Sequence, residues 1–193
     1  KINKKTDFNQ NNYGSQVYAG KLDKIGNYKF TKLDKQNYIN SRPVFLKDGI
    51  IFFDKKGSII KYDKNHKIVW KKNYYSKAEK KLNPILQFSN NDRSLIVADN
   101  LANYYMINLD NGNLAWSKSN SAPFNSQIKI YKDKFFIIDF TNTLKCFSLK
   151  NGEELWSFQT ERSLIRSQKK LSIVIVKDVV YFNNSLGDIS AVN

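Results

Sequence analysis

The sequence is poor in the residues that build metal centres and disulfide frameworks. It contains one cysteine, Cys146, and one histidine, His66, among 193 residues. A single cysteine excludes an internal disulfide framework, and without a second histidine or a cysteine cluster a zinc or copper site has no ligands. Cys146 stands in a strand-like stretch, where we expect a small buried apolar residue and not a nucleophile. The sequence therefore predicts no bound metal and no cofactor.

Long apolar runs and prolines are also scarce. No apolar stretch approaches the roughly 18 residues of a membrane-spanning helix, and the 3 prolines are too few for a Pro-rich linker protein. Residues 1–26 are polar and rich in asparagine, so we expect a flexible segment there. The chain begins at Lys1 and not at a methionine, which favours a processed or trimmed N-terminus. A signal peptide would then not be visible in this sequence.

Acidic residues are in the minority, 17 against 32 lysines and arginines, which gives a formal net charge of +15. Such a charge attracts nucleic acid, anionic lipid or acidic proteins. The lysines, however, are spread along the whole chain, and the longest local cluster, residues 77–81, is interrupted by a glutamate. A bias of the whole sequence toward lysine, asparagine and isoleucine explains this spread better than a nucleic-acid site. We therefore expect no nucleic-acid partner.

What the sequence does contain is an internal repeat marked by its three tryptophans, Trp70, Trp116 and Trp156. They recur at intervals of about 40–45 residues, the length of one propeller blade. A turn residue stands four positions before each of them: His66, Gly112 and Gly152. Asn-Gly between two apolar runs is the strongest short-range signal for a hairpin. We interpret the tryptophans as blade-to-blade packing residues, and truncation of Trp116 or Trp156 to alanine is expected to cost about 3–5 kcal/mol.

A second marker recurs in step with the tryptophans. Four turns contain an aspartate followed by a short apolar strand, and these aspartates are Asp48, Asp92, Asp133 and Asp178. A polar turn and a third strand come next, so each unit has four short strands in about 40–45 residues. Aspartate in such a turn bonds its own backbone more often than it binds a metal.

These units predict an all-β chain of about four β-propeller blades. We place them at residues 43–72, 83–118 and 123–159, with an incomplete blade at 163–193 and a lone outer strand at 27–33. A β-sandwich would not require the same Trp and Gly at the same phase of every unit. The chain is expected to be a piece of a larger ring because it ends within a blade, although four blades closing on themselves would also fit.

The repeat resembles that of quinoprotein-like (PQQ-like) propellers. That family has an aspartate four residues before the glycine, where this chain has Asn108 and Ser148, and a threonine just before it, where this chain has Asn111 and Asn151. Within it, residues 42–49 and 187–192 are similar to BamB-type outer-membrane protein assembly lipoproteins. That resemblance implies an eight-bladed ring, of which this chain would supply about the first half. It also implies a lipid-bearing cysteine near the start of the protein, which either preceded Lys1 or was never there, so the one expected link to a membrane is a lipid anchor outside this chain.

The resemblance also implies a function. BamB-type proteins are non-enzymatic scaffolds that dock the periplasmic domains of the β-barrel insertase, so we expect a monomer located in the periplasm at the inner face of the outer membrane. The alternative is a fragment of a PQQ-dependent quinoprotein dehydrogenase. Those enzymes need a calcium site with a catalytic aspartate, a tryptophan beneath the quinone and usually an adjacent cysteine pair, whereas this chain has one cysteine.

The resemblance further suggests where a partner binds. BamB-type proteins contact the insertase through a short apolar-Arg motif in the loop that enters a blade. The matching stretch here is Ser163, Leu164, Ile165 and Arg166, in a connection where binding residues concentrate. Arginine is an enriched interface anchor, while Leu164 or Ile165 could instead begin the next strand and pack inward.

Overall fold

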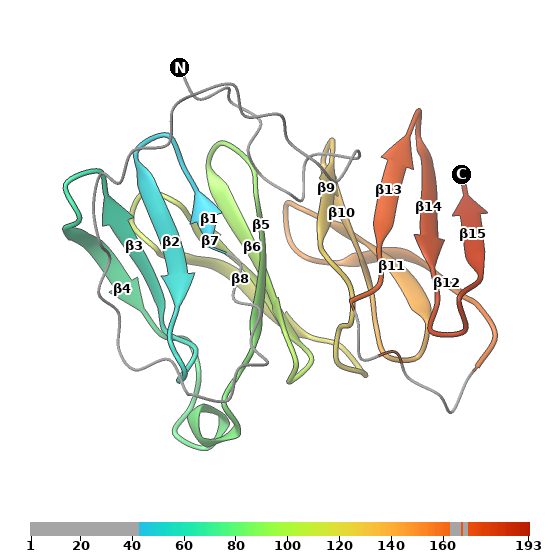
Figure 1. Ribbon diagram of the computed structural model, residues 1–193, viewed down its shortest axis with the longest axis horizontal. Helices are drawn as coiled ribbons and strands as arrows, with labels where there is room; N and C mark the ends of the chain where they lie inside the picture. The colour runs from blue at the N-terminus through green and yellow to red at the C-terminus, as the bar shows by residue number, and fades with distance from the viewer. Residues whose placement is uncertain (1–42, 163–166, 168–169) are drawn as a thin grey trace. The chain divides into compact units, whose positions relative to one another are not determined.

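The computed structural model describes residues 43–162, 167 and 170–193, and these residues form an all-β structure with one 3₁₀ turn (Figure 1). The chain divides into two compact units, Lys1–Ile85 and Leu86–Asn193. The polar segment 1–26 and the expected lone strand 27–33 lie outside the described residues. No helix within the described part is long and apolar enough to cross a membrane.

The first unit contains one four-stranded antiparallel sheet with the strand order β1-β2-β3-β4. Its strands are β1 (Val44–Phe45), β2 (Gly49–Phe53), β3 (Ile59–Asp63) and β4 (Ile68–Lys72). The 3₁₀ turn η1 (Glu79–Leu82) follows β4. A core of Ile50, Ile60 and Tyr62, with Phe52 packed against it, holds this sheet together.

The second unit contains three further antiparallel sheets. The first has strands β5 (Leu86–Asn90), β6 (Ser94–Asp99), β7 (Asn103–Asn108) and β8 (Leu114–Ser119). The next has strands β9 (Lys129–Tyr131), β10 (Lys134–Ile138), β11 (Thr143–Ser148) and β12 (Glu154–Gln159). The last has the three strands β13 (Ile173–Val176), β14 (Val179–Asn183) and β15 (Ile189–Val192). Each sheet is a simple meander, as the repeat predicted.

Burial follows strand position within these sheets. In β6 and β10 every residue after the first is buried, because both faces of the strand are covered. The outer strands β8 and β12 are exposed along most of their length. The third strand of the last sheet has no outer neighbour among the described residues, and its Ile189 is 78% exposed. The all-β architecture of propeller-type antiparallel blades is therefore confirmed.

The hairpins before the tryptophans form as expected, but their geometry differs from the simplest Asn-Gly turn. Gly112 and Gly152 have φ values of 68° and 69°, and His66 occupies the same left-handed region at 64°. Asn111 and Asn151 do not, because each hairpin has a longer loop with a register shift in the preceding strand. In the β7–β8 loop, the N–H of Gly112 donates to the carbonyl of Asn108 at 2.9 Å.

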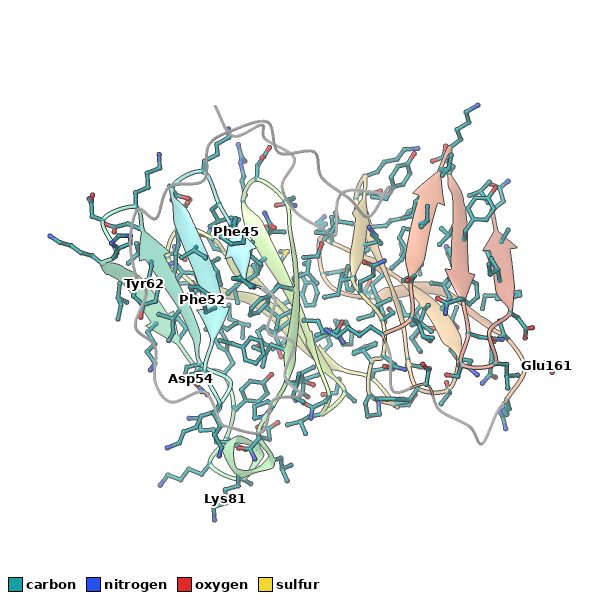
Figure 2. All side chains as sticks on the ribbon, in the orientation of Figure 1. Phe45, Phe52, Asp54, Tyr62, Lys81 and Glu161 are labelled. Carbon is teal, nitrogen blue, oxygen red and sulfur yellow. The ribbon has the colours of Figure 1, made fainter. Side chains whose placement is uncertain are left out.

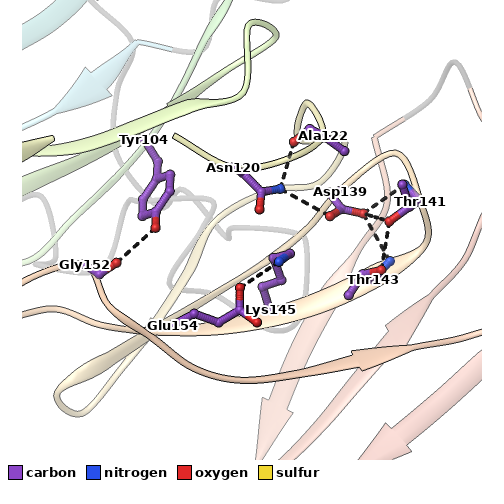
Figure 3. Close-up of polar contacts among 9 residues, drawn as sticks. All are labelled: Tyr104, Asn120, Ala122, Asp139, Thr141, Thr143, Lys145, Gly152 and Glu154. Atoms are coloured by element: carbon purple, nitrogen blue, oxygen red, sulfur yellow. Dashed lines mark hydrogen bonds and ion pairs between the residues drawn. The ribbon is translucent and has the colours of Figure 1, made fainter. Parts of the chain in front are cut away.

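Trp116 joins two neighbouring blades of the second unit. Its Nε1–H donates to the carbonyl oxygen of Leu149 at 3.0 Å, and its ring stacks on Phe135 with centroids 6.1 Å apart. A Cβ built on Gly152 would lie 2.6 Å from the Trp116 ring, so only glycine leaves room for this contact. On the same backbone, the hydroxyl of Tyr104 donates to the Gly152 carbonyl at 3.0 Å (Figure 3).

The other two tryptophans make different contacts, although Trp116 and Trp156 are both partly buried. Trp70 is buried in the first unit. Trp156 is partly buried, lies 5.8 Å from Phe136 between ring centroids, and lines an open hollow of about 210 Å³ together with Val180 and Asn193. At Trp116 the corresponding space is filled by the loop that carries Gly152.

These environments predict unequal costs of truncation. Trp116→Ala should lower the free energy of unfolding by about 3–5 kcal/mol, because it empties an aromatic cluster. Trp116→Phe should lower it by roughly 1–3 kcal/mol, because the Leu149 carbonyl loses its donor. Trp156→Ala, beside an open hollow, should cost less than Trp116→Ala. Urea denaturation of the three variants checks the order, and equal losses for both alanine variants would contradict it.

Candidate functional site

The turn between the second and third strands of every blade is built around a buried acidic or amide side chain. These four residues, called here the Asx turn positions, are Asp54, Asp99, Asp139 and Asn184, and all are at most 7% exposed. They recur at the blade spacing of about 40–45 residues. Sequence reasoning missed them, since buried carboxylates are rare in proteins unless they are paired.

Each Asx turn position fixes its turn in the same way. The Oδ1 atom accepts two backbone N–H groups, from the residues two and four positions further along the chain. At Asp139 these donors are Thr141 at 2.8 Å and Thr143 at 3.3 Å (Figure 3). The Oδ2 atom of Asp139 accepts a hydrogen bond from the Asn120 side chain at 3.2 Å. Since Asn120 follows the outer strand of the preceding blade, this bond links two blades.

The fourth residue of each turn adopts a left-handed backbone. These residues are Gly57, Ala102, Asn142 and Gly187, with φ between 60° and 98°. Asparagine tolerates this region better than most residues because its short polar side chain can bond locally. Asn142 is the member of the set that also uses its side chain to join other segments.

Asp54 shows the electrostatics of such a turn. Burial raises the pKa of this carboxyl, but hydrogen bonds from Ser58, the Lys71 side chain and the Lys56 backbone outweigh it, and the pKa is lowered overall. The Lys71 Nζ atom lies 3.2 Å from Asp54 Oδ2. A lowered folded-state pKa means that this carboxylate stabilises the fold above its unfolded pKa near 4, and that the contribution is lost as the pH falls through the folded pKa.

Asn142 fixes the start of the connection between β12 and β13, residues 160–172. Its carbonyl accepts the Thr160 N–H at 3.3 Å, and its Nδ2 donates to the Glu161 carbonyl at 3.4 Å. Its Oδ1 accepts the Ser185 N–H at 3.0 Å. One buried side chain therefore ties the beginning of this connection to the β14–β15 turn.

Asn125 fixes the end of the same connection. Its Nδ2 donates to the Ser167 carbonyl at 2.9 Å, and its own carbonyl accepts the Leu171 N–H at 2.8 Å. Ser126 forms a parallel bridge with Leu171. The connection is thus held at both ends by buried polar groups of the preceding blade.

The partner residues expected from the sequence belong to this connection. Ser163, Leu164, Ile165 and Arg166 lie outside the described residues, so the geometry concerns the segments on either side of them. The anchors Asn125 and Asn142 were missed. An alignment of the four blades on the turn after their second strand would have revealed Asn142, because it occupies the fourth position of that turn, as Gly57 and Gly187 do.

The chemistry available in the described residues is limited. Cys146 is buried in β11, and burial raises the pKa of its thiol to about 11, so it stays protonated at neutral pH. Within residues 43–162 and the described parts of 163–193, no three His, Cys, Asp or Glu side chains gather as they would around a metal ion.

Comparisons with known proteins agree with this architecture. The model of the family described as outer membrane protein assembly factor BamB matches residues 55–193. No curated protein gives a significant match to the sequence. Among solved structures, BamB from Moraxella catarrhalis is similar, with a TM-score of 0.65 at 15% identity over 79% of this chain and 45% of that one. The chain thus spans less than half the length of that protein.

Two computationally designed proteins are similar as well. Ika4 has a TM-score of 0.59 at 11% identity, covering 79% of this chain and 91% of the designed one. Ika8 has a TM-score of 0.62 at 10% identity, covering 77% and 44%. At such identities the likeness to these structures shows the fold alone.

The anchoring of the β12–β13 connection leads to a prediction. Asn142→Gly keeps the left-handed backbone but removes the side-chain bonds to Ser185 and Glu161, so it should lower the free energy of unfolding by about 1–3 kcal/mol. Ala102→Gly is the matched control, because Ala102 occupies the same turn position, at φ 68°, without such bonds. It should be neutral or stabilising by up to about 1 kcal/mol. Urea denaturation measures both, and equal stability of the two variants would disprove the anchoring role.

Proposed function

Because the chain belongs to the family of the outer membrane protein assembly factor BamB, we propose that it is a non-catalytic, protein-binding scaffold in the assembly of outer-membrane β-barrel proteins. Its partner in this proposal is the set of periplasmic domains of the barrel insertase. Its location is the periplasm, at the inner face of the outer membrane, where a lipid anchor outside this chain would hold it. The chain acts as a monomer and contributes blades to an eight-bladed ring.

The family match over residues 55–193 is the observation that carries this proposal. The anchored β12–β13 connection supports it, because a loop whose ends are fixed by buried Asn125 and Asn142 loses less conformational entropy on binding. The residues proposed to contact the partner are Ser163, Leu164, Ile165 and Arg166. In that role Leu164 and Ile165 supply an apolar anchor, and the Arg166 guanidinium supplies a planar fork of donors.

The described side chains favour a scaffold over a quinoprotein dehydrogenase. Trp116 already uses its ring against Gly152 and its N–H on the Leu149 carbonyl, so it is not available as a platform beneath a quinone. Cys146 is buried and has no cysteine neighbour in the sequence with which to form a redox pair.

The proposal predicts that Arg166→Glu weakens binding to the insertase's periplasmic domains by roughly 30-fold, the effect of losing about 2 kcal/mol at an interface anchor. The measurement is the dissociation constant of the chain on the immobilised domains, by surface plasmon resonance. Arg93→Glu is the matched control, since Arg93 is exposed in the β5–β6 turn and the change in net charge is the same.

The two variants distinguish a specific Arg166 contact from a general effect of net charge. Weakening by Arg166→Glu alone supports the site. Equal weakening by both variants would show a general charge effect and remove Arg166 from the interface. Unchanged binding in Arg166→Glu, with the unfolding curve intact, would also remove it. If the chain itself does not bind the domains, the scaffold proposal in this form is wrong.

A further inference from the structure

The loop after β4 is a structured projection of the first unit. Ser76 and Glu79 form a reciprocal pair, in which the Ser76 N–H donates to Glu79 Oε2 at 2.8 Å and the Glu79 N–H donates to Ser76 Oγ at 3.2 Å. This is the capping box of a helix start. Asn83, in the left-handed region at φ 51°, ends the turn. Residues 76–83, called here the basic loop, are therefore locally ordered.

The basic loop gathers positive charge at one end of the first sheet. It carries Lys77, Lys80 and Lys81, and Figure 2 shows Lys81 pointing away from the sheet. The β2–β3 turn with Lys55 and Lys56 lies against its base. A Cβ built on Gly57 would be 2.5 Å from the Tyr75 ring and 2.7 Å from Pro84, the two residues that flank the loop.

The carboxylates near the basic loop are already engaged. Asp54 accepts hydrogen bonds within its own turn and pairs with Lys71, while the Glu79 carboxylate caps η1. Among the described residues, none pairs with Lys77, Lys80 or Lys81. Elsewhere in the described chain, lysines such as Lys61 and Lys145 lie 2.8 and 2.7 Å from carboxylate oxygens. The basic loop thus presents charge that no carboxylate of the described residues neutralises.

The composition of this surface indicates which anion it suits. Its positive charges are all lysines, which are depleted at protein–protein interfaces, where arginine and aromatic residues are enriched. Lysine acts as a point charge and needs no planar partner. Next to the lysines, Leu82 is 62% exposed although it is apolar. Clustered lysines beside an exposed apolar side chain are the combination that binds anionic lipid surfaces.

We propose that the basic loop, with Lys56 beside it, binds the surface of a lipid bilayer through anionic phospholipid headgroups, with Leu82 entering the interface. This proposal does not depend on the proposed scaffold function or on the residues proposed for it. It would orient the first unit at a membrane independently of any covalent lipid anchor.

The test is co-sedimentation of the chain with vesicles of phosphatidylcholine alone and with vesicles that also contain phosphatidylglycerol. We expect binding only to the second kind, and a decrease as salt is raised. The double variant Lys77→Glu, Lys81→Glu should weaken this binding at least about 30-fold, the effect of about 1 kcal/mol for each lysine. Leu82→Ser should weaken it by several-fold, since burying an apolar side chain favours the interface.

The matched control is the double variant Lys64→Glu, Lys67→Glu, which changes the net charge equally in exposed residues of the β3–β4 loop. It should reduce binding only slightly. Equal loss in both double variants would overturn the proposal, because total charge and not the basic loop would then drive binding. Binding of the chain to polyglutamate but not to the anionic vesicles would overturn it in favour of an acidic protein partner. Circular dichroism of each variant confirms that the fold is retained.

Discussion

The contact between Trp116 and the Gly152 backbone is the interaction on which the second unit depends. A four-stranded blade has two apolar faces and cannot cover both by itself, so its stability comes from its neighbours. Gly152 has no side chain, which leaves room for the Trp116 ring against its backbone. Trp116 supplies a large apolar ring and an N–H donor for the Leu149 carbonyl.

Much of this arrangement could be predicted because its markers are rare residues at fixed spacing. The tryptophans and the glycines four positions before them predict the blades, their outer strands and the hairpins. The Asx turn positions could not be predicted in the same way. Aspartate and asparagine are common in this sequence, the fourth member is Asn184 and not an aspartate, and nothing in the sequence shows that Asp139 is buried. Only the hydrogen bonds from Thr141 and Thr143 reveal its role.

The turns after the second strands and the connections after the outer strands differ in how uniform they are from blade to blade. The turns after the second strands are nearly identical in every blade, because each must satisfy the same buried Asx side chain. The connections after the outer strands, residues 73–85, 120–128 and 160–172, differ in length and content. Each connection keeps a few buried residues that hold it to the sheet, such as Phe124, Ile128 and Leu171. Its exposed residues are free of that constraint, so changes among them alter the surface at little cost to the core.

Net charge and charge placement carry different information in this chain. A compositional bias accounts for the number of lysines, and some of them pair with a carboxylate, as Lys61 does with Asp48 and Lys145 with Glu154. The same bias does not explain why three unpaired lysines and an exposed leucine share a loop ordered by a capping box. Holding like charges close together is unfavourable unless an anion relieves the repulsion. The order of the basic loop, and not the total of +15, therefore points to an external anionic surface.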